Sequence, residues 1–565
     1  MILSSWILFV LAIQIIHFLG TWRLYKAAGY KGWYAAVPIY NAFILMKIIK
    51  RPSWWVLLLF IPTINLIVFG AIWIETLRSF GKNTIKDTFL GLASFGLYIY
   101  TINYSKKPSH IPNRDLRSKT GIGETLSSIL YAIVAATIVH NYIMQPYIIP
   151  TGSLEKSLLI GDFLFVSKFH YGARVPMTAV SFPMVHDTIP FLKIRSYLKN
   201  PQLPYLRLPA LQKIKRNDIV VFSWPADTVR QFFVREKRVD KPIDKKSNYV
   251  KRCLGIPGDT LEIINGFVHT NGVKNILPSR ARVQYTFNAF AQKGVSSRKL
   301  IAAGFEDFNR KYKIENITEN SYQKLIPHIV GRIGNTVEDF SVITKAKGLP
   351  PELIRQLGLR VSEVLETNKE LTLTINEANG LKSLEGIDSV KQRVLKSKTS
   401  NETFFPNKIP FNWNEDNFGP LLIPKKGMTI SLTRDNLPLY KKIIQDYENN
   451  TLEFTPTKIK INNKVETKYT FKKDYYWMMG DNRHRSEDSR FWGFVPEDHI
   501  VGKPVFIWFS IKGINDGIKN WSVRWNRVFT TVDGPGERYS YFPFFIGFVI
   551  IWQGFVYIRK RKLKK

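Results

Sequence analysis

The stretch "IIPTGSLEKSLLIGD", residues Ile148–Asp162, follows almost directly on the apolar run "TLSSILYAIVAATIVHNYIM" of residues 125–144. The run is long enough to cross a bilayer as a helix. Behind it, Pro150 restricts the backbone, and Gly152 permits a close approach of another segment. Taken alone, Thr151 and Ser153 are more often ordinary turn residues. What they do depends on two other stretches, far away in the sequence.

Length and composition allow several domains and argue against several classes of protein. The chain has 565 residues, of which 45% are apolar, so a sizeable core can form. Its one cysteine, Cys253, excludes an internal disulfide framework and a cysteine-rich metal site. The sequence contains no HExxH motif, which argues against a zinc hydrolase. We therefore expect no metal and no cofactor.

The net charge of +37 could indicate a nucleic-acid-binding protein. However, Lys and Arg crowd beside apolar segments and in the last residues, "RKRKLKK", and the sequence has no zinc finger or RNA-recognition signature. Basic flanks that meet anionic lipid headgroups explain these clusters better. We expect a lipid bilayer as a partner and no nucleic acid.

Five apolar segments predict transmembrane helices. The first lacks a basic region before it and a small-residue cleavage site, which favours a retained anchor over a signal peptide. Basic residues gather in residues 21–51, after residue 103 and after residue 558, so these regions are expected to be cytoplasmic. The chain from about residue 145 to residue 540 would then face outward. The predicted spans are Ile2–Gly20, Trp54–Ile74, Thr88–Asn103, Leu126–Met144 and one within Tyr541–Ile558.

The outward-facing region has a mainly β pattern. Short runs of Val, Ile, Phe and Trp predict strands at 163–169, 218–224, 260–272 and 504–511, with Asn-Gly hairpin turns at 265–266 and 271–272. Residues 277–470 read as a mixed α/β insertion, with helical stretches such as 351–370. We thus predict a membrane-anchored, mainly antiparallel β protein. Its expected parts are a multi-span region (1–120), an anchor helix (121–145), a β-domain in two parts (146–276 and 471–520), the insertion (277–470), and a C-terminal helix with a basic tail (521–565).

The second stretch that could carry catalytic residues is "NYVKRCLGIPGDTLEI", residues 248–263. Lys251 lies in an apolar, strand-like setting. A lysine on an ordinary β-surface extends its ammonium into solvent. A lysine buried without a carboxylate partner has a pKa well below about 10.4 and can accept a proton as a general base.

The third stretch is "YYWMMGDNRHRSEDSRFWGFVP", residues 475–496. It packs two Asp–Arg combinations, Asp481 with Arg483 and Asp488 with Arg490, and two hydroxyls into a few residues between aromatic strands. A salt-bridged surface loop is the simpler interpretation. A calcium loop is not expected, because the EF-hand spacing and its closing glutamate are missing.

Together, the three stretches resemble those of bacterial type I signal peptidases, membrane-bound serine proteases with a Ser/Lys dyad. The resemblance rests on "PTGS…LLIGDFLFVSKFHYG", "NDIVVFSWP", "YVKRCLGIPGD" and "MMGDNRHRSEDSRFWGFVPEDHIVG", which occur in the family's order. It covers neither the N-terminal multi-span region nor the long insertion. It implies cleavage of signal peptides from exported precursors after an A-x-A-like site. It also implies a bacterial inner membrane with the catalytic domain on the periplasmic side, and a possible association with the secretion machinery.

The resemblance also assigns roles to individual residues. It implies that Ser153 is the nucleophile and Lys251 the general base, with Thr151 as an oxyanion donor and Ser486 orienting the lysine. The supporting ion pair of the family falls on Asp488 and Arg490, and Asp481 and Arg483 would brace the turn. Small substrate side chains would enter pockets lined by Tyr147, Ile149, Pro150 and Val250.

Two positions depart from the common family pattern. Lys156 stands where a proline is frequent, and Asn217 where a glycine is common. Two alternatives remain beside the protease: a non-catalytic membrane scaffold that binds secretory precursors, and a membrane module whose N-terminal spans carry the function. A catalytic role for Cys253 is a weaker alternative, since that position is usually small and apolar.

Overall fold

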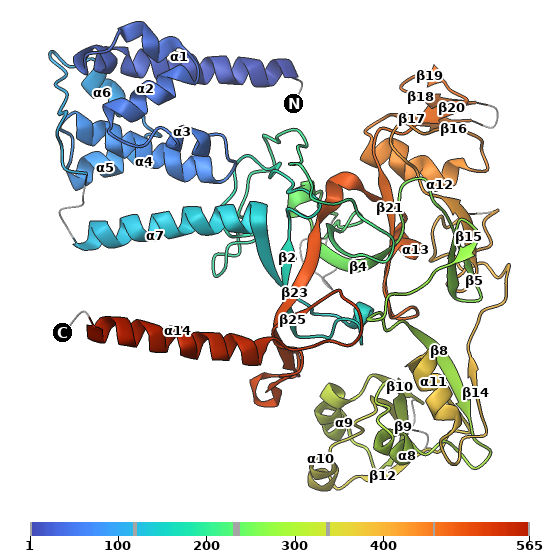
Figure 1. The fold of residues 1–565 in the computed structure, drawn as a ribbon. Coiled ribbons are helices and arrows are strands. Elements are labelled where there is room, and N and C mark those ends of the chain that lie inside the picture. Colours follow the sequence, from blue (N-terminus) through green and yellow to red (C-terminus); the bar gives the residue numbers. More distant parts are fainter. Residues whose placement is uncertain are drawn as a thin grey trace.

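The structure is a computed structural model that describes residues 3–116, 121–229, 238–334, 340–408, 410–455 and 458–562. Its N-terminal part is a helical bundle (Figure 1). Leu24, Ile44, Ile64 and Ile72 belong to its buried apolar core. The bundle comprises α1 (Leu3–Ala27), α2 (Tyr40–Ile48), α3 (Trp55–Leu58), α4 (Ile64–Ser79), α5 (Ile85–Ala93) and α6 (Ile99–Asn103).

Two of the predicted spans are wrong as single helices. The segment Trp54–Ile74 divides into α3 and α4, because Pro62 offers no N–H and disfavours helical geometry before it. The segment Thr88–Asn103 divides between α5 and α6 at Phe95 and Gly96, which both have positive φ.

A buried ion-pair network holds α4 within the bundle. Its Glu75 is buried and pairs with Arg51 at 3.1 Å and also with Arg114. These partners come from outside the apolar run that predicted the span, so hydropathy alone could not reveal them.

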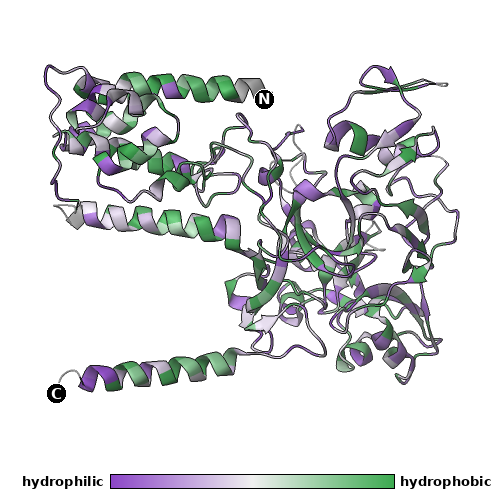
Figure 2. Ribbon diagram, turned by 45° about the horizontal axis from the view of Figure 1, so that its top comes forward, coloured by the Kyte–Doolittle hydropathy of each residue, from purple (hydrophilic) through white to green (hydrophobic). Residues whose placement is uncertain are grey.

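Within the described residues, three helices are long and apolar enough to cross a membrane: Ile7–Ala27, Gly123–Ile143 and Phe542–Lys562. They correspond to α1, to α7 (Gly121–Ile138) with the π-helical turn that continues it (Val139–Ile143), and to α14 (Phe542–Lys562). In Figure 2, where the ribbon is coloured by residue hydropathy, these helices are largely hydrophobic, and the last turns of α14 are hydrophilic. In Figure 1, α7 and α14 leave the β-domain toward the same side.

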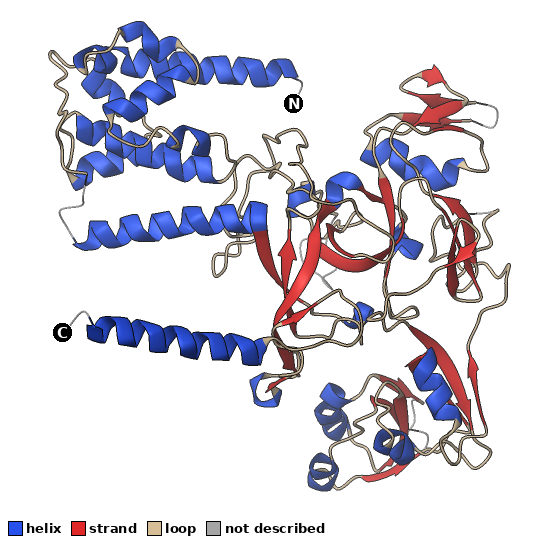
Figure 3. Ribbon diagram, in the orientation of Figure 1, coloured by secondary structure: helices blue, strands red, loops and turns tan. Residues whose placement is uncertain are grey.

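A curled nine-stranded sheet forms the centre of the molecule (Figure 3). Its main path runs β1-β2-β23-β3-β4-β21-β22, with β24 and β25 on β23, and all of these strand pairings are antiparallel. The predicted strands at 163–169, 218–224 and 504–511 are confirmed as β2, β3 and β23. The bounds are β1 (Met144–Ile148), β2 (Asp162–Ser167), β3 (Ile219–Ser223), β4 (Asn248–Gly255), β21 (Tyr475–Met479), β22 (Val495–Pro496), β23 (Ile500–Lys512), β24 (Ser522–Val523) and β25 (Thr530–Thr531).

The predicted Asn-Gly hairpins are confirmed. Strands β5 (Thr260–Ile264), β6 (Phe267–Thr270) and β7 (Val273–Lys274) are joined at Asn265–Gly266 and Asn271–Gly272, and all four turn residues have positive φ. This backbone twist matches that of the paired strands. The hairpins share a sheet with β15 (Phe418–Leu422), so a strand of the insertion extends the sheet that the hairpins form.

The insertion is mixed α/β and contains several small sheets. The predicted helix at 351–370 is only partly correct: α10 covers Pro351–Gln356, and Gly358 with positive φ precedes the strand Arg360–Glu363. The remaining strands are β8 (Gln284–Phe290), β9 (Asn309–Glu315), β10 (Gly331–Ile333), β11 (Ser341–Lys345), β12 (Arg360–Glu363), β13 (Asn368–Thr374), β14 (Ser389–Gln392), β16 (Thr429–Ser431), β17 (Leu452–Phe454), β18 (Ile459–Ile461), β19 (Lys464–Val465) and β20 (Lys468–Thr470). The remaining helices are α8 (Ser297–Ala302), α9 (Glu319–Leu325), α11 (Ile375–Lys382), α12 (Leu437–Lys442) and, after the insertion, α13 (Ser489–Trp492).

Candidate active site

Ser153 and Lys251 meet in the structure. Ser153 lies in a single 3-10 turn (Gly152–Leu154) just after β1, and Lys251 lies in β4. The Lys251 Nζ donates a hydrogen bond to Ser153 Oγ at 2.6 Å. Lys251 is buried, with 4% of its surface exposed. The curled sheet therefore brings together a hydroxyl from the turn after β1 and an amine from β4, although β1 and β4 do not pair with each other.

Burial also changes the acidity of the Lys251 ammonium. It lowers the pKa of Lys251 to about 8, with the carboxylates of Asp488 and Glu487 partly opposing the shift. Desolvation dominates because a buried charge loses its hydration. At pH 7 about a tenth of the Lys251 side chains are therefore neutral amines, and the fraction reaches about half near pH 8.

The main chain of Ser153 is held by the loop after β21. The Asn482 amide donates to the Ser153 carbonyl at 3.0 Å, and the Asn482 side chain donates to the Gly152 carbonyl at 3.2 Å. Gly480 allows this close approach, because a Cβ there would lie 2.6 Å from the Ser153 carbonyl oxygen. Thr151, two residues before Ser153, is exposed.

Two buried ion pairs fix that loop. Asp488 forms a bidentate pair with Arg490, both contacts being 2.9 Å, and also accepts the Gly480 amide at 3.0 Å. Burial would raise the pKa of Asp488, but Arg490 outweighs this and holds the pKa below its usual range. Asp481 and Arg483, which were both expected to brace the turn, do not pair with each other, because Asp481 pairs with Arg252 through contacts of 2.7 and 2.6 Å.

The guanidinium of Arg483, unlike that of Arg490, does not form an ion pair with the aspartate two residues away in the sequence. Burial lowers the pKa of Arg483, and its Nε has no partner among the described residues. The Arg483 amide instead donates to the Gln284 carbonyl at 3.0 Å. Arg483 thus braces the turn through its backbone.

Ser486 lies near the dyad without a hydrogen bond to Lys251. Its Oγ is buried and has no hydrogen-bond partner among the described residues. A Cβ at Gly480 would lie 2.2 Å from that Oγ and would also approach Ser153. Ser486 and Ser153 therefore flank the same glycine.

A cleft of about 1160 Å³ opens beside the dyad. Tyr147, Ile149, Pro150 and Val250, the predicted pocket residues, all line it together with Thr151, Ser153 and Lys251. Ile149 is buried and belongs to an apolar cluster, with Tyr147 and Val250 packed against that cluster. The cleft thus offers an apolar wall on the side of β1 and β4.

The insertion forms another wall of this cleft. Residues 304–309 and 372–373 line it, as does Glu377. Two ion pairs join the insertion to segments next to the dyad: Lys156 contacts Glu377 at 2.5 Å, and Arg485 contacts Asp307. The cleft is therefore built jointly by the central sheet and the insertion.

The two departures from the family pattern have a structural basis. Asn217 has a φ of 71°, a conformation that favours glycine and that asparagine tolerates better than most residues. Lys156 has a φ of 66°, which a proline cannot adopt. The turn after Ser153 therefore differs from one that contains proline, and the ion pair with Glu377 forms at this residue.

Cys253 is poorly suited to nucleophilic chemistry. It is completely buried, and burial raises the pKa of its thiol far above the ordinary value. Its Sγ donates to the Gly255 carbonyl at 3.4 Å. A thiolate would be strongly disfavoured there.

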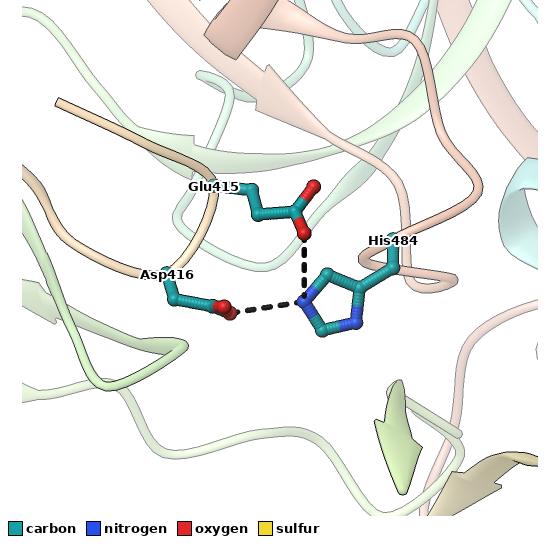
Figure 4. A group of neighbouring side chains, drawn as sticks. All are labelled: Glu415, Asp416 and His484. Carbon is teal, nitrogen blue, oxygen red and sulfur yellow. Dashed lines mark hydrogen bonds and ion pairs between the residues drawn. The ribbon is translucent and has the colours of Figure 1, made fainter. Parts of the chain in front are cut away.

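Glu415, Asp416 and His484 form a cluster whose metal-ligand atoms lie within 4.8 Å of one another (Figure 4). His484 Nδ1 accepts the Thr286 amide at 3.0 Å, so Nε2 carries the hydrogen that is donated to Asp416 at 2.9 Å. Glu415 accepts from Arg393 at 3.1 Å. Because these atoms are already hydrogen-bonded and the Arg393 guanidinium contacts Glu415, the cluster fits a contact between the insertion and the loop after β21 better than a metal site.

Several contacting residues were not predicted from the sequence. Gln284, at the start of β8, donates through its side chain to the Glu155 carbonyl at 2.7 Å and through its amide to the Asp481 carbonyl at 2.8 Å. It lies in "RVQYTF", which carries only a strand pattern. His484, Arg485 and Asn482 were visible in the polar loop, but their partners lie in distant parts of the chain.

A serine hydroxyl bonded to a buried amine of lowered pKa, beside a partly apolar cleft, suits a hydrolase that uses a nucleophile and a general base. The family described as "Signal peptidase, peptidase S26" matches residues 122–331 and 423–509, just over half of the chain. The chain therefore belongs to this signal peptidase family. Residues 33–112, in the helical bundle, match a family of unknown function, DUF5684.

Curated relatives named signal peptidase I cover much of the chain. The protein from Buchnera aphidicola subsp. Schizaphis graminum is 23% identical over 404 residues, which are 70% of this chain and 78% of the relative. The Haemophilus influenzae protein is 23% identical over 417 residues, 72% and 75% of the two chains. The Rickettsia typhi protein is 28% identical over 163 residues, 29% and 48% of the two chains.

Proposed function

We propose that this protein is a type I signal peptidase that removes signal peptides from exported precursors by means of Ser153 and Lys251. The 2.6 Å hydrogen bond between Lys251 Nζ and Ser153 Oγ carries the proposal. Membership of the signal peptidase family supports the choice of substrate.

The proposed reaction is transfer of an acyl group to water. Neutral Lys251 accepts the proton of Ser153, and the Ser153 oxygen attacks the scissile carbonyl. The Ser153 amide, near the N-terminal end of its turn, and the Thr151 hydroxyl would donate to the oxyanion. Lys251 then gives its proton to the leaving amine and takes one from the water that attacks the ester.

The proposed substrate binds as an extended strand. Among the described residues, β4 pairs with β21 only from Arg252 onward and β1 pairs only with β2, which leaves one edge of β1 and one edge of β4 at Val250–Lys251 unpaired beside the cleft. An extended peptide could add to these edges through its main chain. Alanine side chains of the A-x-A site would enter the pockets beside Ile149 and Val250.

The proposal is tested by cleavage of an exported precursor in detergent. Wild-type protein should cut after the A-x-A site, whereas Ser153→Ala and the similarly long Lys251→Met should not. Cys253→Ala should retain activity. Cleavage by Ser153→Ala at the wild-type rate would reject the nucleophile. A wild-type protein that binds precursors but never cuts them would favour the scaffold alternative.

We also propose that α7 and α14 anchor the protein in a bacterial inner membrane with the cleft on the periplasmic side. The length and hydropathy of these helices support the anchoring, and the basic last turn of α14, Arg559 to Lys562, supports the orientation. In a Cys253→Ala background, a membrane-impermeant maleimide applied from the periplasm should label Lys398→Cys and Glu537→Cys but not Lys107→Cys. Labelling only of Lys107→Cys would reverse the orientation.

A further inference from the structure

A second, smaller pocket lies between the β-domain and the helical bundle. Its volume is about 290 Å³. Thr63 of the bundle, His140 and Asn141 at the end of the α7 span, and the loop that follows β2 all contribute to its lining. Tyr147 and Asn248 line both this pocket and the catalytic cleft. The pocket is therefore at the end of a candidate membrane helix.

The lining of this pocket is strongly cationic. Lys168, Arg174 and Lys245 face a single carboxylate, Asp244. Asp244 is already engaged, because it accepts the amides of Met177 and Thr178 at 3.0 and 2.9 Å and the Thr178 hydroxyl at 2.7 Å. Asp244 makes no ion pair with Lys168, Arg174 or Lys245, and its charge acts on Arg174 and Lys245 only from beyond ion-pair distance.

The three basic side chains differ in how many hydrogen-bond acceptors they contact. Lys245 donates to the Ser181 hydroxyl at 2.6 Å, and Arg174 donates to the Asp498 carbonyl at 2.8 Å and the Ser223 hydroxyl at 3.2 Å. The Lys168 ammonium has neither an ion pair nor a hydrogen-bond acceptor among the residues that the structure describes. Burial and the Arg174 charge lower the pKa of Lys168 to about 7. A bound anion would stabilise its charged form.

We propose that this pocket binds a phosphate group, supplied either by the headgroup of a membrane lipid or by free phosphate. A phosphate offers several strong acceptors to Lys168 and Arg174, and Arg suits phosphate oxygens through its fork of donors. The position at the end of the α7 span places the pocket where lipid headgroups lie if that helix crosses a bilayer. The inference does not depend on catalysis.

The test follows the reactivity of Lys168 in the full chain carrying Ser153→Ala, purified in maltoside micelles that contain no phosphate. Acetic anhydride labels the neutral amine, and mass spectrometry measures acetylation of each lysine. The probes are chloride, inorganic phosphate at equal ionic strength, and short-chain phosphatidylglycerol. We expect acetylation of Lys168 to fall several-fold with an occupying phosphate group, while acetylation of exposed Lys213 stays unchanged.

The two sources give different results. Protection by inorganic phosphate identifies a site for a free anion, and protection by phosphatidylglycerol alone identifies a headgroup site. Native mass spectrometry adds a second readout: Lys168→Met should lose one bound phosphate or lipid, whereas Lys213→Met should keep it. Unchanged acetylation of Lys168 with both probes, or equal binding by the two variants, would overturn the proposal.

Discussion

Lys251 donates to Ser153 at 2.6 Å across a separation of 98 residues in the sequence. The contact exists because β1 and β4 approach the same cleft from different parts of the curled sheet. The two side chains also differ in burial: the lysine is almost completely enclosed, whereas the serine is partly accessible. A substrate can therefore reach the hydroxyl while the amine stays shielded from water.

The lowered pKa of Lys251 predicts the pH dependence of cleavage. In the proposed mechanism the neutral amine is the active form, so kcat/KM should rise as pH increases and level off above about 8. Peptide cleavage measured between about pH 6 and pH 10 tests this. Lys442 has a pKa lowered by burial to about 8 but lies outside the cleft lining, so Lys442→Met should leave the inflection unchanged. An activity that falls through this range would contradict a lysine base.

Gly480→Ala should strongly impair catalysis. The added methyl would lie 2.2 Å from Ser486 Oγ and 2.6 Å from the Ser153 carbonyl oxygen, so the serines must move apart. Overpacking of this kind costs about 1–3 kcal/mol of folding stability, and a displaced nucleophile lowers kcat by about 100-fold. A methyl added at Gly380 in α11 would meet nothing within 4 Å, so Gly380→Ala should retain normal kcat. Equal kcat for both variants would show that the Gly480 region tolerates the methyl.

Asp481→Ala should destabilise the protein more than a change in an exposed ion pair. It leaves the buried Arg252 charge without its carboxylate, a change that costs about 3–5 kcal/mol in comparable sites. The exposed pair of Lys199 and Asp240 provides a matched control, and Asp240→Ala should cost about 0–1 kcal/mol. Urea unfolding followed by tryptophan fluorescence measures both changes. Similar midpoints for the two variants would refute a structural role for the Arg252–Asp481 pair.

Glu377→Gln should affect substrate binding more than chemistry. The substitution removes the ion pair with Lys156 that joins the insertion to the segment after Ser153. Because partly exposed pairs contribute at most about 1 kcal/mol, we expect KM for a precursor to rise up to about fivefold with little change in kcat. Glu385→Gln, which removes an exposed pair with Lys299, should leave KM unchanged. A change confined to kcat would place Glu377 in a different role.

Much of the candidate site was visible in the sequence because its residues lie in short, dense stretches. Ser153, Lys251 and the polar loop stand out by residue type and spacing, but their proximity came only from the family resemblance. The sequence does not reveal Arg252 as the partner of Asp481, because Arg252 lies in a distant strand, next to Lys251. Gln284 gave no signal, since a glutamine in a strand pattern does not reveal which distant carbonyl it contacts.

The membrane region shows the limit of hydropathy. The runs at 54–74 and 88–103 are apolar enough to suggest spans, yet Pro62 and the Phe95–Gly96 turn divide them into shorter helices. The partners of Glu75 lie outside either run. The mean hydropathy of a sequence window does not show whether its apolar side chains contact lipid or pack within a helical bundle.

The shared direction of α7 and α14 has a consequence for how the enzyme meets its substrate. A catalytic domain on one flexible stalk could swivel and sample many orientations. Two helices that enter one bilayer would remove most of that rotational freedom. They would keep the cleft at a nearly constant distance from the membrane surface and in a nearly constant orientation. A precursor held in the same membrane would then search in two dimensions only, with a correspondingly higher effective concentration.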